Sequence, residues 1–137
     1  SYTMLNKKSG LLGISGVSAD NRDIEQAIAD RNERAKLAMD HYHYAIAAYI
    51  AKCAVAMNGL DVITFTAGVG ERGRDSRAEI CKKLEFMGVK LDLDANQEAF
   101  AVEAKISADD SKVLVNVVPT NEELMIAKET KRIVSEI

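Results

Sequence analysis

The chain has 137 residues, of which 47% are apolar and 28% charged, and its net charge is −3. This size and apolar content suit one ordinary domain with a buried core, and the slightly acidic charge argues against binding to nucleic acid or to an anionic membrane. No apolar run reaches membrane-spanning length and the start lacks a signal peptide, so we expect a cytoplasmic protein with a small-molecule or protein partner.

The first half of the chain predicts helices. Three glycines in a small-residue stretch before residue 20 indicate bends rather than a continuous helix, and a helix with acids in its first turn is expected over Asp20–Asn32. Apolar residues then recur at helical spacing over Asn32–Met57, which predicts a long, alanine-rich helix ending at Asn58.

The second half predicts strands alternating with helices. The β-branched segments Asp61–Ala67 and Lys112–Val118 are typical of parallel strands buried on both faces, and Thr120 with Glu123 matches a capping box at the start of a closing helix. This order indicates an α/β protein, helix-rich with a few mainly parallel strands. Two strands fall short of the roughly 4–6 of a typical sheet, so either strands are missed or the chain is part of a longer protein.

Directly after the first predicted strand, residues 68–73 match the G-x-G-x-x-G pattern of a dinucleotide-binding turn. Asp92 stands where such a motif needs an acid for the ribose, so an NAD(P)-dependent oxidoreductase is one reading. Against it, Gly73 is followed by four polar residues, whereas the motif needs an apolar helix packed on the strand. We therefore expect Gly73 to lie in a loop and Asp75 or Ser76 to be the N-cap of the next helix.

What remains of the pattern is a strand, a glycine turn and a helix. Gly68 and Gly70 carry no side chains, so their backbone N–H groups can approach a phosphate or the sugar of a nucleotide. A tight connection with no ligand explains the same pattern, and the residues alone do not decide between the two.

Three segments in fixed order resemble the C-terminal third of the acetate kinase family, the ATP-dependent acetate and propionate kinases. They read LNKKSGLLGISGVSADNRD, VITFTAGVGERGRDSR and VPTNEELMIAKET. The resemblance implies a ribonuclease-H-like domain of the actin, Hsp70 and sugar kinase superfamily. It also implies that residues 1–137 are the C-terminal part of the second, nucleotide-binding domain of an acetate kinase, so we expect a fragment.

The resemblance also assigns site residues. The family's Asp-x-Arg and Gly-Ile-Gly-Glu-Asn segments imply that ATP binds at Asp20, Asn21, Arg22, Gly68, Val69, Gly70, Glu71 and Arg72. The last of these, Arg72, stands where the family has an asparagine, and a guanidinium only donates hydrogen bonds whereas an amide also accepts them. The family's magnesium-associated glutamate corresponds to Glu122, and carboxylate oxygens are what Mg²⁺ prefers.

The activity implied is the phosphorylation of acetate by ATP to give acetyl phosphate and ADP, with Mg²⁺ on the phosphates. In the family pattern the acetate pocket and the phosphoryl-transfer residues lie upstream, so this chain carries no catalytic residue and should be inactive alone. Propionate is the alternative substrate, and a homodimer is expected because the family dimerises through its C-terminal domain. A non-catalytic interaction module built on the helix Asn32–Met57 is the alternative from another class.

Overall fold

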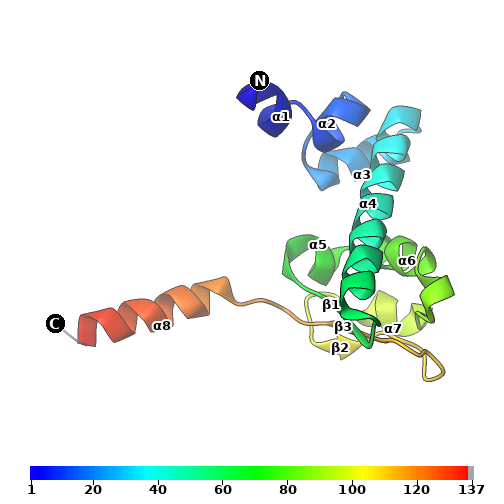
Figure 1. The fold of residues 1–137 in the computed structure, drawn as a ribbon. Helices are drawn as coiled ribbons and strands as arrows, with labels where there is room; N and C mark the ends of the chain where they lie inside the picture. Colours follow the sequence, from blue (N-terminus) through cyan, green and yellow to red (C-terminus); the bar gives the residue numbers. More distant parts are fainter. Residues whose placement is uncertain (136–137) are drawn as a thin grey trace. The chain divides into compact units, whose positions relative to one another are not determined.

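A computed structural model describes residues 1–135, with the exception of the side chain of Glu122 (Figure 1). It divides into two compact units, Ser1–Gly59 and the residues from Leu60 onward, and each is described by itself. Within the described residues, no helix combines the length and the apolar character needed to cross a membrane.

The first unit is helical. Its elements are α1 (Tyr2–Lys7), α2 (Gly10–Ser15), α3 (Asn21–Ala29) and α4 (Glu33–Met57). The predictions of α3 and of the long helix α4 are confirmed, and the glycine-containing stretch expected to bend holds one short helix, α2. Glycine still interrupts this stretch, because α2 ends at Gly16 in the left-handed conformation, with φ of 70°.

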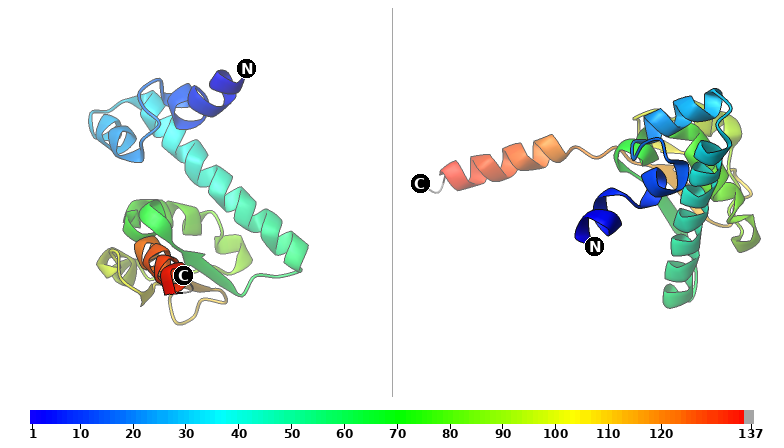
Figure 2. Two further views of the ribbon diagram at one scale, coloured as in Figure 1. Left: turned by 90° about the vertical axis from the view of Figure 1, so that its left-hand side faces the viewer. Right: turned by 90° about the horizontal axis from the view of Figure 1, so that it is seen from above.

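Helix α4 has an asparagine cap at each end and packs its first turns into a small apolar core. The Asn32 side chain accepts a hydrogen bond from the Ala35 N–H at 3.0 Å, and α4 ends at Asn58, whose φ of 57° leaves the helical conformation as predicted. Ile24 of α3 packs with Ala35 and Met39 of α4 in the core of this unit. Figure 2 shows α2 and α3 beside the N-terminal half of α4.

The second unit is a small sheet with helices. Its elements are β1 (Val62–Phe65), α5 (Ala67–Arg72), α6 (Arg74–Lys82), the 3₁₀ turn η1 (Glu85–Met87), α7 (Leu93–Glu98), β2 (Ala104–Lys105), β3 (Leu114–Val117) and α8 (Glu122–Ser135). The sheet order is β1-β3-β2. Strands β1 and β3 are parallel, with Val62 opposite Leu114, and the two-residue β2 runs antiparallel to β3. Both predicted strands are confirmed, and β2 is too short to leave a pattern in the sequence.

Only one face of the β1–β3 pair is buried. Ile63, Phe65, Val115 and Val117 point into the core, whereas alternate residues such as Val62, 48% exposed, do not. The expectation of strands buried on both faces is therefore wrong for this structure. An all-apolar strand looks the same in sequence whether one face or two are covered.

Helix α8 extends away from the strands, as Figure 1 and the right-hand view of Figure 2 show. All of its described side chains are exposed. The segment that leads into α8 leaves β3 at Val118, whose N–H donates to the Phe65 carbonyl at 2.9 Å. This bond continues the parallel pairing to the ends of both strands. The segments that leave β1 and β3 therefore start side by side.

Candidate nucleotide-binding site

The glycine-rich segment after β1 folds into the short helix α5 rather than the expected glycine turn. Strand β1 ends at Phe65, and α5 begins two residues later at Ala67. A Cβ atom on Gly70 would come within 3.2 Å of the Phe65 carbonyl carbon. Glycine at this position thus lets α5 pack directly against the end of the strand.

Gly68 is not explained by packing. A Cβ atom there would meet nothing within 4 Å, and its φ lies outside the left-handed region. Glycine at this position leaves the main chain bare on an open side of α5, which suits the close approach of a ligand. The preceding Ala67 has φ of 58°, a conformation that costs an L-residue roughly 1–2 kcal/mol and that concentrates at functional sites.

Gly73 separates α5 from α6. Its N–H donates to the Val69 carbonyl at 2.8 Å, and a Cβ atom on Gly73 would lie 2.5 Å from that same oxygen. Gly73 lies outside α6, as predicted, but the predicted N-cap at Asp75 or Ser76 is wrong, because Gly73 itself is the N-cap and α6 begins at Arg74. The four polar residues after Gly73 form the first turn of α6, and two of them, Ser76 and Arg77, are buried.

A buried arginine, not anticipated from the sequence, holds α5, α6 and α7 together. The Arg77 side chain is fully buried, and its Nη1 donates to the Gly70 carbonyl at 2.8 Å. Its other hydrogen bonds go to Asn96, through the Oδ1 atom at 2.8 Å and the carbonyl at 2.9 Å, and to the Ala99 carbonyl at 2.6 Å. The Asn96 amide in turn donates to the Arg74 carbonyl at 3.0 Å. This network anchors α5 to α6 and α7 through the Gly70 carbonyl.

Glu71, in the last turn of α5, faces the segment that leaves β3. Its carboxylate oxygen Oε1 accepts the Thr120 N–H at 2.7 Å and the Thr120 hydroxyl at 2.9 Å, and the residue is only 8% exposed. The Thr120 N–H and then its hydroxyl lower the pKa of Glu71 against the opposing effect of burial, with smaller contributions from the Ala67 N–H and the charge of Arg72. Glu71 is therefore a carboxylate at neutral pH.

The start of α8 differs from the predicted capping box. Asn121 caps the helix, because its Oδ1 accepts the Leu124 N–H at 2.9 Å, and the Thr120 hydroxyl is engaged by α5 rather than by the backbone of Glu123. Glu122, the residue predicted to bind metal, is the first residue of α8, and its side chain lies outside the described part of the chain.

The other predicted nucleotide residues lie in the first unit, at the N-terminus of α3. Asp20 caps this helix by accepting the Arg22 N–H at 2.9 Å, and its carboxylate also takes two hydrogen bonds from the Arg22 guanidinium, at 3.1 and 2.6 Å. This pairing lowers the pKa of Asp20 to about 2. Asn21 is the first residue of α3. The predicted residues thus form two clusters, one in each unit.

Arg72 is the predicted residue that departs from the family pattern. It is exposed in the last turn of α5, and its guanidinium adds only weakly to the ionisation of Glu71 beside it. Nothing in the packing of the second unit explains why arginine stands here.

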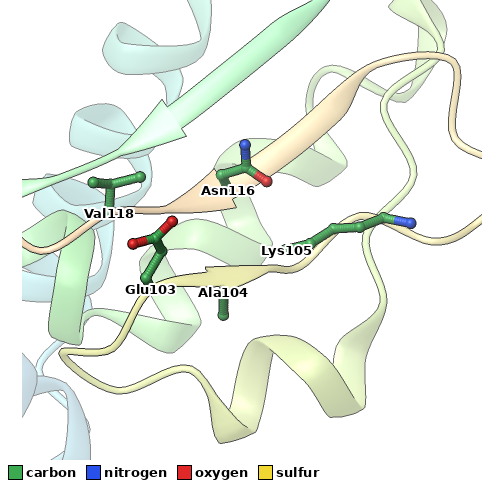
Figure 3. A pocket seen from close by; sticks show the side chains of 5 residues that line it. All are labelled: Glu103, Ala104, Lys105, Asn116 and Val118. Carbon is green, nitrogen blue, oxygen red and sulfur yellow. The ribbon is translucent and has the colours of Figure 1, made fainter.

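A shallow hollow of about 390 Å³ lies beside strands β2 and β3 (Figure 3). It is lined by Glu103, Ala104, Lys105, Asn116 and Val118. Charges of opposite sign line this hollow, and it contains no residue predicted to bind nucleotide.

Comparison with known proteins decides the family. The sequence pattern of the acetokinase family matches residues 2–128. The chain belongs to the acetokinase family. It is 56% identical to the acetate kinase of Thermotoga petrophila over 99% of its own length. It superposes on the crystal structure of Porphyromonas gingivalis acetate kinase with a TM-score of 0.86, at 50% identity over 96% of the chain, and on a propionate kinase from Francisella tularensis with a TM-score of 0.82, at 38% identity over 93%.

The likeness to acetokinase structures confirms the predicted fold class. The chain spans about a third of the length of these proteins, covering 34% of the Thermotoga petrophila enzyme, 33% of the Porphyromonas gingivalis chain and 32% of the Francisella tularensis chain. The dinucleotide reading is set aside on geometry as well, because Gly73 lies between two helices, and Asp92 caps α7 by accepting the Ala95 N–H at 3.0 Å.

Proposed function

We propose that this chain supplies the nucleotide-binding part of an ATP-dependent acetate kinase, which transfers the γ-phosphoryl group of ATP to acetate. Membership of the acetokinase family and the high identity to an acetate kinase support the reaction. Propionate is the second candidate substrate, because a propionate kinase is among the similar structures. ATP is a cytoplasmic substrate, so we also propose that location.

The observation that carries the nucleotide proposal is Gly68. Gly70 and Gly73 are explained by close contacts inside the protein, whereas the open side of Gly68 has no structural explanation. In this proposal the nucleotide approaches the bare main chain of α5 at Gly68, and the exposed Arg72 at the far end of the same helix donates to a phosphate.

The residues present fit a magnesium nucleotide. Among the described residues no cluster of three acids, histidines or cysteines could hold an ion alone. Mg²⁺ is usually held by one or two carboxylates together with water and substrate phosphates, so a single carboxylate from Glu122 suits it. Mg²⁺ would neutralise phosphate charge in the reaction, and the role of this chain is to hold the nucleotide against α5.

Titration of the isolated chain with ADP tests the proposal. We expect Gly68→Ala to weaken ADP binding while the fold is kept, because the added methyl group stands only where a ligand would approach. Circular dichroism of the same variant serves as the folding control. Equal ADP affinities of the wild type and Gly68→Ala would remove α5 from the nucleotide site.

The same titration tests the cluster in the first unit. Arg22→Ala should weaken ADP binding if the N-terminus of α3 borders the nucleotide. Arg132→Ala is the matched control, because Arg132 is also an exposed arginine paired with an acid close to it in the sequence. A loss that is equal in both variants would indicate a general effect of charge rather than a site at Arg22.

Catalysis by the chain alone is not expected. Acetyl phosphate formation from ATP and acetate by the purified chain would show that it contains the acyl pocket and the transfer groups, which the proposal places elsewhere in the enzyme.

We also propose that the enzyme is a homodimer in which α4 provides part of the contact. Leu37, Tyr44 and Val55 of α4 are 60%, 63% and 82% exposed. Their spacings are close to two and three helical turns of about 3.6 residues, so the three side chains form one apolar line. Sedimentation of the wild type and of Tyr44→Glu tests this, and an unchanged oligomeric state would exclude α4 from the contact.

A further inference from the structure

Glu71 joins two segments that lie 49 residues apart in the sequence. On one side it belongs to α5, and its backbone carbonyl accepts the Ala101 N–H at 3.0 Å. On the other side its carboxylate takes both the N–H and the hydroxyl of Thr120 on a single oxygen, at 2.7 and 2.9 Å. Glu71 thus forms hydrogen bonds through both its main chain and its side chain, and the donors to its carboxylate belong to the protein.

The segment that Glu71 contacts is short and constrained at both ends. It leaves β3 at Val118, whose N–H is bonded to the end of β1, and it enters α8, where Asn121 accepts the Leu124 N–H. Thr120 stands between these two fixed points and directly before the Asn121 cap. A hydrogen bond at Thr120 therefore determines where the first turn of α8 stands relative to α5.

We infer that Glu71 is a positioning residue, which sets where the first turn of α8, and with it the main chain of Glu122, stands relative to the glycine helix α5. This inference rests on the proposed function, in which α5 receives the nucleotide and Glu122 serves its Mg²⁺. Glu71 acts through Thr120 and makes no contact with the nucleotide through its carboxylate. The part of ADP affinity that depends on Mg²⁺ should therefore require the Glu71–Thr120 contact, and the part that is independent of Mg²⁺ should not.

Two measurements on the isolated chain test this. The first needs no ligand: hydrogen exchange at the Thr120 amide should become about tenfold faster or more in Glu71→Ala, because the bond to a charged acceptor is lost. The second is the ratio of ADP affinities with and without Mg²⁺. We expect this ratio to fall about tenfold in Glu71→Ala, with little change in the affinity measured without Mg²⁺.

Conservative variants separate positioning from a general loss of structure. Thr120→Ser keeps both donors and should retain the wild-type ratio, whereas Thr120→Val keeps only the N–H and should give an intermediate ratio. Glu71→Gln keeps the acceptor oxygen without its charge and should also be intermediate. If Glu71→Ala does not fold, the graded series of these three variants decides the question, and equal ratios in all three would overturn the inference.

The outcomes also separate this inference from the proposed function. A wild-type chain that binds ADP more tightly with Mg²⁺, together with variants that keep this enhancement, would overturn the positioning role alone. Unchanged exchange at Thr120 in Glu71→Ala would do the same. No binding of ADP by the wild type would overturn the proposed function of the chain and this inference with it.

Discussion

Arg77 offers the sharpest test of how the second unit holds α5 in place. Its guanidinium is fully buried and donates to four acceptors on three other residues. Arg77→Ala removes every one of these donors at once and leaves Gly70, Asn96 and Ala99 with unpaired oxygens.

The expected cost follows from those contacts. A buried acceptor left without its donor costs about 1–3 kcal/mol, so the four acceptors together cost at least about 4 kcal/mol. Domains are stable by only about 5–15 kcal/mol, so this loss is a large fraction of the total. Since about 1.4 kcal/mol corresponds to a factor of ten, opening of the second unit should become roughly a thousandfold more frequent.

Hydrogen exchange at the backbone amides of β1 and β3 measures that opening directly. Arg72→Ala is the matched control, because Arg72 lies five residues earlier in the chain but is exposed, and its loss should change stability by less than about 0.5 kcal/mol. If Arg77→Ala accelerated exchange by no more than Arg72→Ala, the hydrogen-bond network around Arg77 would not be what secures α5.

Two further predictions concern single positions. Gly73→Ala should destabilise the second unit measurably in urea, because its Cβ atom would lie 2.5 Å from the Val69 carbonyl oxygen, whereas Gly68→Ala meets no atom and should be neutral or stabilising, by up to about 1 kcal/mol. If both variants had the same urea midpoint, the close contact at Gly73 would be refuted. The folded pKa of Asp20, about 2, lies below its ordinary value of 3.8, so its stabilising effect is complete above that value and is lost as the pH falls through 2. Carbon-13 NMR titration should show this midpoint near 2 and a higher one in Arg22→Ala, and an unchanged midpoint in the variant would contradict the pairing.

The elements with strong local patterns could be predicted from the sequence. The long helix α4 and the strands β1 and β3 follow from apolar periodicity and from β-branched runs, and Asn58 gave the helix end correctly. The family resemblance was confirmed by the comparisons, and it supplied the nucleotide assignment that the glycines alone could not.

What escaped prediction depends on contacts between distant segments. The polar residues after Gly73 led to a predicted N-cap at Asp75 or Ser76, yet these residues are helical and Arg77 among them is buried with acceptors from α5 and α7. Thr120 and Glu123 matched a capping box locally, but Glu71 takes both donors of Thr120. Local patterns describe which bonds a residue can make with its neighbours, and they do not show a competing partner brought close by the fold.

The parallel register of β1 and β3 sets which residues of the two following segments lie opposite each other. Because Phe65 lies opposite Val117, Thr120, three residues after Val117, lies within hydrogen-bonding distance of Glu71. One residue inserted directly after Leu114 would shift the rest of β3 by about 3.3 Å and turn Val115 and Val117 to the opposite face. The same insertion in the turn before β3 would leave both the core and the spacing intact. Length changes in this unit are therefore tolerable ahead of the strand and damaging within it.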